Sequence, residues 1–158
     1  MGFSQFAAAV LVSYIGLPVG VFLASMTKEE LPTARKYFPL LQKLAIITIA
    51  AFALDYFAAG VATRTASYIV LLFLLLFHLA VPLYYAAFGF LAFAVSAIPE
   101  ALLVISSLVF LFGMLTGSAS FPERLKKGDA LQAARELLAR NALYPAAAMV
   151  TYFISVYV

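Results

Sequence analysis

Three titratable residues stand within or beside long apolar stretches, and they are the side chains that could do chemistry. Glu100 follows Ile98-Pro99, His78 ends a run of leucine and phenylalanine, and Asp55 comes just before an aromatic pair. Ionisable groups are costly inside a membrane helix and often mark a pathway for protons or ions. Glu100, His78 and Asp55 are therefore candidates for binding or relaying a proton or a cation.

Each candidate also has a purely structural explanation. Pro99 suits the first position of a helix and Glu100 the next, where the helix dipole favours an anion. If the chain instead turns near 88–90, Glu100 lies about ten residues inside a helix, a distance of about 15 Å from the start. Only the second placement supports a proton relay, and the sequence leaves both open.

The other two candidates have local partners available. A lone histidine on an apolar helix commonly bonds a neighbouring polar group or a carbonyl, and an ion pair with Arg64 at the membrane surface would explain Asp55. The chain has no cysteine and His78 is its only histidine, so we expect no metal site and no bound cofactor.

Four basic residues surround the first polar segment: Lys28, Arg35, Lys36 and Lys43. Their side chains could snorkel to the headgroup region, or form a surface that contacts anionic lipid or a phosphate-bearing substrate. The basic residues do not form the single clustered footprint of a nucleic-acid-binding protein, so we expect no nucleic acid as a partner. No nucleophile motif accompanies them, which makes a lipid-active membrane enzyme a third hypothesis only.

The composition specifies the environment of these residues. Of the 158 residues 66% are apolar and 11% are charged, whereas soluble domains have about 45–50% and about 25%. The excess of apolar side chains must face lipid. We therefore predict an all-α protein, a polytopic helix bundle that forms a single integral membrane domain over residues 1–158.

About five transmembrane helices fit the apolar stretches, within a range of four to six. The expected spans are 3–26, 37–58, 66–88, 91–117 and 141–158, and polar connectors at 27–36 and 118–140 join them. Each connector should contain a short helix in the membrane interface, the second one starting near Asp129.

Charge and length disagree about the number of spans. Five spans place the two connectors on opposite faces of the membrane. Four basic residues lie around the first connector and five in the second, and the positive-inside rule would place both connectors on the cytoplasmic face. That arrangement requires a sixth span, so length favours five spans and charge favours six.

Two pairs of glycines, Gly16 with Gly20 and Gly113 with Gly117, have the four-residue spacing that lets membrane helices approach closely, within one chain or between chains. The function we expect is that of a transporter or channel component in the cell membrane that moves a proton, a cation or a small solute. The alternative is a non-catalytic structural subunit or scaffold of a larger membrane complex. Partners would be the lipid bilayer and further copies of the chain or other membrane subunits.

Overall fold

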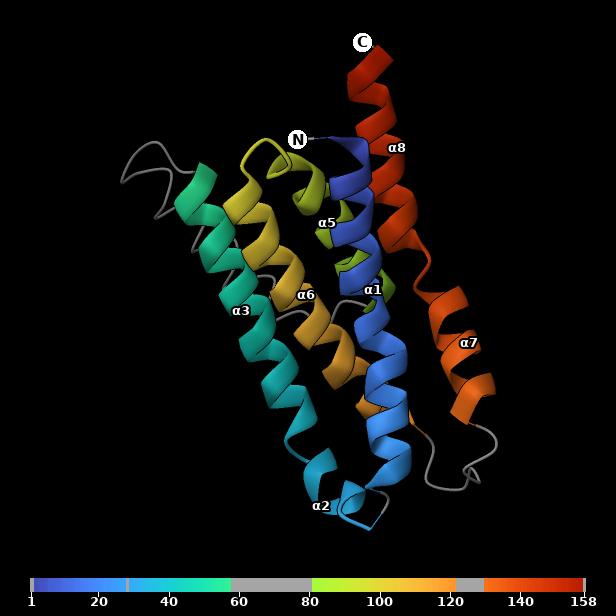
Figure 1. Cartoon of the computed structure of the whole chain (residues 1–158). Helices are drawn as coiled ribbons and strands as arrows, with labels where there is room; N and C mark the ends of the chain where they lie inside the picture. The colour runs from blue at the N-terminus through green and yellow to red at the C-terminus, as the bar shows by residue number, and fades with distance from the viewer. Residues whose placement is uncertain (1, 28, 58–80, 122–129, 158) are drawn as a thin grey trace.

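The computed structural model describes residues 2–27, 29–57, 81–121 and 130–157 (Figure 1). These residues form seven helices and, over the same ranges, no strand, so the chain is an all-α bundle as its sequence predicted. The helices are α1 (Phe3–Met26), α2 (Leu31–Arg35), α3 (Phe38–Phe57), α5 (Val81–Ala94), α6 (Pro99–Ser120), α7 (Ala130–Arg140) and α8 (Leu143–Tyr157).

Three of the helices are long and apolar enough to cross a membrane: Phe3–Met26, Phe38–Tyr56 and Pro99–Ser120. Two further apolar helices, α5 and α8, are shorter. Large apolar side chains such as Leu103 (68% exposed) and Val12 (59% exposed) stand on the outside of the bundle, which is expected where lipid replaces water. The chain is therefore a membrane protein.

The long apolar stretch is interrupted between Ala94 and Pro99, and not at the expected turn at 88–90. Helix α5 continues through Gly89 to Ala94, and α6 begins at Pro99, not at residue 91. Gly89 does not turn the chain, because its role is to let α5 approach α8: a Cβ on Gly89 would lie 2.5 Å from the Tyr144 carbonyl oxygen. The expected span 66–88 lies mostly outside the described residues.

The two glycine pairs of the sequence meet inside the chain. Helices α1 and α6 run parallel in contact, and a Cβ on Gly16 would lie 2.2 Å from the Phe110 carbonyl oxygen. A Cβ on Gly117 would lie 2.2 Å from the Leu17 carbonyl oxygen. The two backbones therefore touch, and glycine is required because any side chain would push the helices apart.

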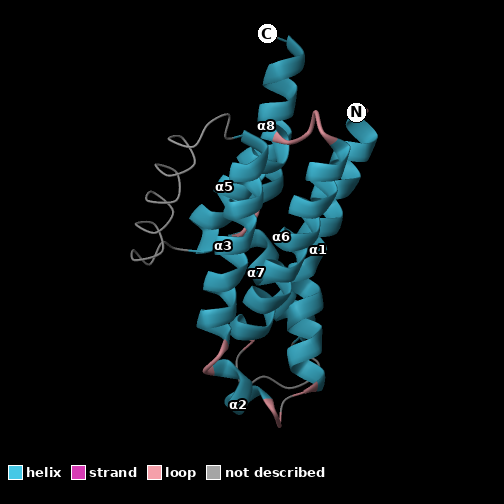
Figure 2. Cartoon of the chain, turned by 90° about the vertical axis from the view of Figure 1, so that its left-hand side faces the viewer, coloured by secondary structure: helices cyan, strands magenta, loops and turns pink. Residues whose placement is uncertain are grey.

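The described residues of the first polar connector (27 and 29–36) and the start of the second (118–121) lie at one end of the bundle, here called the connector end. Because α1 and α6 are parallel, their last turns meet there, where the Ser118 hydroxyl donates a hydrogen bond of 2.9 Å to the Gly20 carbonyl. The Arg35 guanidinium, at the end of α2, donates to the Phe121 carbonyl just after α6. Figure 2 shows α2 at this end of the molecule. The distribution of basic residues favoured one side of the membrane for both connectors, whereas five spans would place them on opposite sides.

Helix α7 does not lie across the end of the bundle as an interfacial helix would. Its buried residues Ala130 and Ala134 pack with Val21 and Ala24 of α1, and α7 runs lengthwise beside α1 (Figure 1). The sequence places Leu131, Ala134, Leu137 and Leu138 on one face of this helix; Ala134 of that face is buried against α1, whereas Leu131 is 61% exposed. Helix α8 then continues beside the other half of α1, with the rings of Tyr152 and Phe6 stacked at 4.9 Å.

Candidate functional site

Helices α7 and α8 together follow the whole of α1, but they are interrupted at Asn141 and Ala142. The sequence enforces this break through Pro145, which has no backbone N–H and whose ring would clash with the carbonyl of Asn141 in a continuous helix. The Asn141 carbonyl instead accepts a bond of 3.2 Å from the N–H of Tyr144, three residues later. This tight turn separates two helical segments that a regular helix would join.

The break lies beside the middle of α1, where polar side chains gather. The Tyr14 hydroxyl donates to the Leu138 carbonyl in the last turn of α7, and the Ser13 and Tyr144 hydroxyl oxygens are 2.5 Å apart. Ser13 is also 2.9 Å from two carbonyls of the preceding turn of α1. Because a hydroxyl has one proton to donate, and Ser13 donates it to these carbonyls, the Tyr144 hydroxyl is the donor of the hydrogen bond to Ser13 Oγ.

Two buried polar atoms at the break have no hydrogen-bond partner of normal geometry among the described residues. Asn141 is 1% exposed, and its Nδ2 donates to the Leu137 carbonyl at 2.9 Å while Oδ1 accepts nothing. The fully buried Tyr85 hydroxyl lies next to Thr116 without a regular hydrogen bond. An unsatisfied buried polar group costs about 1–3 kcal/mol, and such a group calls for an explanation, of which a binding role is one.

We call Ser13, Tyr14, Tyr85, Asn141 and Tyr144 the helix-break site. The ring of Tyr85 on α5 packs at 6.0 Å, edge to face, against that of Tyr144 on α8. These side chains come from three directions, since α1, α5 and the α7–α8 junction each contribute. The site combines one free amide acceptor with a group of hydroxyls in an apolar bundle.

A short polar row leads from the helix-break site toward the connector end. Thr116 of α6, beside Tyr85, accepts a hydrogen bond of 3.2 Å from Nε2 of Gln42 on α3. Gln42 is only partly buried and lies in the second turn of α3, near the connectors. Thr116 and Gln42 thus extend the set of polar side chains from Tyr85 toward the connector end.

The acidic residues singled out in the sequence do not reach this site. Glu100 is exposed in the first turn of α6, directly after Pro99. This is the position at the start of a helix that its structural explanation requires. Asp55 is exposed in the last turns of α3. Because α3 runs antiparallel to α6, both carboxylates stand at the end opposite the connectors. His78 and Arg64 lie outside the described residues.

The basic set is only partly described. Lys36 and Lys43 are exposed, and the Lys36 ammonium lies 4.9 Å from the centre of the Tyr37 ring. Arg35 joins the two connectors through its bond to Phe121, and Lys28 lies outside the described residues. Contact of these side chains with anionic headgroups stays a prediction. Within the described ranges no group of three or more His, Cys, Asp or Glu residues could hold a metal ion.

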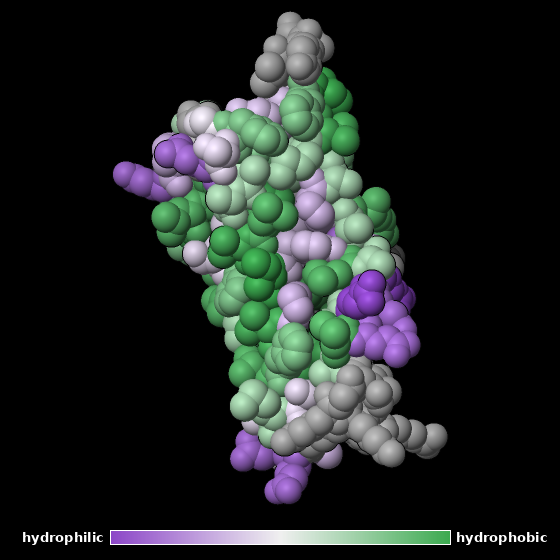
Figure 3. Space-filling model, turned by 45° about the vertical axis from the view of Figure 1, so that its right-hand side comes forward, coloured by the Kyte–Doolittle hydropathy of each residue, from purple (hydrophilic) through white to green (hydrophobic). Residues whose placement is uncertain are grey.

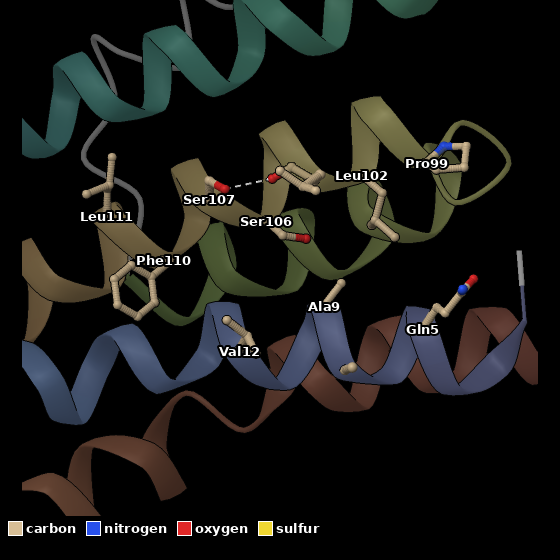
Figure 4. Close-up of a pocket in the computed structure, with 11 residues that line it drawn as sticks. Gln5, Ala9, Val12, Pro99, Leu102, Ser106, Ser107, Phe110 and Leu111 are labelled. Atoms are coloured by element: carbon tan, nitrogen blue, oxygen red, sulfur yellow. Dashed lines mark hydrogen bonds between the residues drawn. The ribbon is translucent and has the colours of Figure 1, made fainter.

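A separate groove runs along α1 and α6 on the outside of the bundle (Figure 4). It has a volume of about 730 Å³ and mostly apolar walls, including Ala8, Val12 and Leu103. Ser106 lines it with a buried hydroxyl that has no partner, whereas Ser107 bonds the Leu103 carbonyl at 2.8 Å. The groove offers an apolar surface but no group that could drive a reaction.

Sequence reasoning missed the helix-break site because its members are single polar residues scattered through apolar stretches. One local signal was available: Pro145 stands four residues after Asn141, the spacing at which proline interrupts a helix. Comparison of the chain with protein families, with characterised proteins and with solved structures finds no match.

Proposed function

We propose that this chain is a multi-pass protein of the cell membrane that moves a small solute or ion through the helix-break site, as a transporter or channel component. The observation that supports this most is the interruption between α7 and α8 beside the middle of α1. In transporters, interrupted helices commonly carry the substrate site near the centre of the bilayer. Since α1 is long enough to span the membrane, its midpoint would lie near that centre.

The chemistry of the site suggests the class of cargo. Its described side chains are hydroxyls and one amide, so they hold a cargo by hydrogen bonds and oxygen dipoles and not by a full charge. Asn141 Oδ1 can accept and the Tyr85 hydroxyl can donate or accept. On this chemistry the first candidate cargo is a small neutral solute with both donor and acceptor groups, and the second is a monovalent cation held by oxygens.

A proton route through carboxylates receives no support from the described residues. Every described Asp and Glu is exposed, and Glu100 and Asp55 stand at the end of the bundle opposite the connectors. The polar row through Thr116 and Gln42 offers a route between the site and the connector end. Toward the other end the rings of Phe6 on α1 and Tyr152 on α8 stack at 4.9 Å, so a route between these two helices would require α8 to move relative to α1.

The second candidate function is that of a structural subunit. The glycine contacts between α1 and α6 make a closely packed pair, and the buried residues described carry no charge. A bundle of this kind could brace other membrane proteins without moving anything. The two functions differ in whether the purified chain supports any flux.

The test is flux into liposomes that contain the purified chain, measured for urea, glycerol, sodium, potassium and protons. Tyr85→Phe removes only an unpartnered hydroxyl, and Asn141→Leu removes the unpartnered Oδ1 together with the Nδ2 hydrogen bond to Leu137, both with little change of shape. Each should slow flux about tenfold, the effect of losing one hydrogen bond worth about 1.4 kcal/mol.

Tyr56→Phe is the matched control, because Tyr56 is exposed at the far end of α3. That variant and Glu100→Gln should leave the rate unchanged. Loss of flux in Glu100→Gln with normal flux in Asn141→Leu would move the pathway to Glu100. No flux of any probe through the natural chain would favour the structural subunit.

A further inference from the structure

The described helices pack into two units, each held together by a backbone contact at glycine. In the first, α1 lies against α6, where Gly16 leaves no room for a Cβ; α3 packs on α6, and α7 packs on α1 through Ala134. In the second, α5 lies against α8: a Cβ on Gly89 would lie 2.5 Å from the Tyr144 carbonyl oxygen and 3.0 Å from the Ala147 Cβ. We call them the α1–α6 unit and the α5–α8 unit. Backbone atoms cannot rotate away as a side chain can, so each unit is a closely packed body.

Aromatic rings lie along the boundary between the two units. The ring centre of Phe112 on α6 is 5.5 Å from that of Tyr85 on α5. At the end opposite the connectors the Phe6 ring of α1 stacks on that of Tyr152 of α8. These contacts are made by side chains, which can adjust their rotamers while the helices slide. The boundary can therefore change its geometry more readily than the glycine contacts inside each unit.

The chain passes between the units at places where its helices are interrupted. Helix α7 belongs to the α1–α6 unit and α8 to the α5–α8 unit, so the break at Asn141 and Ala142 is one such crossing. The connection 95–98 between α5 and α6 is another, and it ends at Ile98 in an extended conformation with φ −116° and ψ 98°. Hinges are loop or helix-terminal positions that absorb changes of backbone angle. Both described crossings are positions of this kind.

The helix-break site lies on the boundary between the units. Ser13 and Tyr14 belong to the α1–α6 unit, Tyr85 and Tyr144 to the α5–α8 unit, and Asn141 to the crossing between them. The Tyr85 hydroxyl and Asn141 Oδ1 are buried without a regular hydrogen bond. A buried polar atom without a partner destabilises the arrangement that contains it. A second arrangement of the units that satisfies these atoms is favoured by comparison.

We propose that the α5–α8 unit tilts against the α1–α6 unit through hinges at 95–98 and 141–142, and that the tilt opens the helix-break site toward the end opposite the connectors. In the present arrangement the polar row through Thr116 leads toward the connector end, while the rings of Phe6 and Tyr152 meet at the other end. The tilt separates these two rings. Its purpose rests on the proposed transport function, but the motion itself can be measured without any flux.

The outer surface of α8 is suited to such a movement inside a membrane. Val150, Phe153 and Ile154 are large, apolar and exposed on this helix. Figure 3 shows mainly hydrophobic residues on the upper part of the molecule, below the C-terminus. A shift of α8 therefore keeps apolar side chains against lipid and exposes no charged group of this helix to it.

A cross-link over the boundary tests whether transport requires the tilt. Phe3 of α1 and Phe153 of α8 are exposed, their ring centres are 5.4 Å apart, and the natural chain has no cysteine. When a short, cleavable bifunctional thiol reagent joins Phe3→Cys to Phe153→Cys, flux should fall to that of empty liposomes and return on cleavage. The control is Val150→Cys/Ile154→Cys, which carries the same reagent one turn apart within α8 and should keep its flux. Natural flux through the fully joined Phe3→Cys/Phe153→Cys chain would overturn the proposal.

Distances between spin labels report the motion without any transport. Cysteine labels at the exposed positions Leu103 of α6 and Val150 of α8 lie on different units, whereas labels at Leu83 of α5 and Val150 lie on one. The first pair should show two distances and the second pair one. A single narrow distance for the first pair, with and without each candidate solute, would overturn the tilt even in a chain that transports. Two distances in a chain without flux would support the tilt and contradict only the proposed transport function.

A matched pair of proline variants tests the hinge at the helix break. Pro145→Ala restores an N–H that a continuous helix directs at the Asn141 carbonyl, so the two distances between Leu103 and Val150 should merge into one. Pro18→Ala, inside α1, should leave both distances in place. Two distances that persist unchanged in Pro145→Ala would refute a hinge at 141–142.

Discussion

Replacing Gly20 with alanine should force α1 and α6 apart and destabilise the bundle. The new Cβ would lie 2.1 Å from the Met114 carbonyl oxygen, whereas ordinary contact begins at 3.4 Å. The helices must therefore separate locally by about 1.3 Å, since the obstructing atom belongs to the backbone and cannot rotate away. Overpacking costs about 1–3 kcal/mol, and a backbone obstruction puts this site near about 3 kcal/mol.

Alanine also favours a helix over glycine by about 1 kcal/mol, so the expected net loss is about 2 kcal/mol. The assay is unfolding of the chain in mixed micelles with increasing dodecyl sulfate, followed by the helical circular dichroism signal. Gly113→Ala should cost less, because its Cβ would meet its nearest atom at 3.0 Å, and Gly2→Ala should cost nothing, with its nearest atom at 4.0 Å. A Gly20→Ala variant as stable as the natural chain would refute the backbone contact between α1 and α6.

Three further outcomes follow from the structure. Tyr144→Phe removes the hydroxyl that bonds α1, so it should lower the free energy of unfolding by about 1 kcal/mol in the same assay; an equal loss in Tyr56→Phe would contradict this. Ser106→Ala removes a buried hydroxyl without a partner, so it should be neutral or stabilise the bundle by up to about 1 kcal/mol, and a clear destabilisation would show that the hydroxyl is bonded. Single cysteines at Lys36 and Ser120 should be labelled by an impermeant reagent from one side of the membrane, and a cysteine at Glu100 from the other; labelling of Lys36 and Ser120 from opposite sides would contradict the parallel arrangement of α1 and α6.

The helices that the sequence predicted best are those whose ends carry their own signals. Residues 3–26 and 37–58 were expected to be helical and correspond to α1 and α3, because polar or aromatic residues bound both stretches. The start of α6 was harder to predict, since Gly89 and Pro99 are both residue types that often interrupt a helix. Gly89 proved to be a packing glycine, and only the position of α8 reveals that role.

The candidate site could not be predicted from the periodicity of the sequence. Ser13 and Tyr144 are 131 residues apart, and neither differs locally from any other polar residue on an apolar helix. Their contact depends on α8 lying beside α1, which no local pattern encodes. Charge is rare in this composition, which made Glu100 and Asp55 candidates, but both are exposed at the end opposite the connectors. The buried polar residues described are all neutral.

The orientation of α7 also could not be predicted from its own sequence. An amphipathic pattern shows which face of a helix is apolar and cannot show whether that face meets lipid or protein. Here it meets α1 through Ala130 and Ala134. The distribution of basic residues, in contrast, favoured one side for both connectors. The positive-inside rule responds to the topology of the chain and not to the length of its helices.

The most direct test of the central claim is modification of Asn141→Cys during transport. The natural chain has no cysteine, so a small hydrophilic thiol reagent can act only at the helix-break site. We expect the reagent to label this cysteine and stop flux of the transported solute, while flux through an Ala146→Cys variant, exposed on α8, continues after labelling. An Asn141→Cys chain that transports at the natural rate once fully labelled, or whose thiol is never labelled while flux proceeds, would contradict a pathway through the break between α7 and α8.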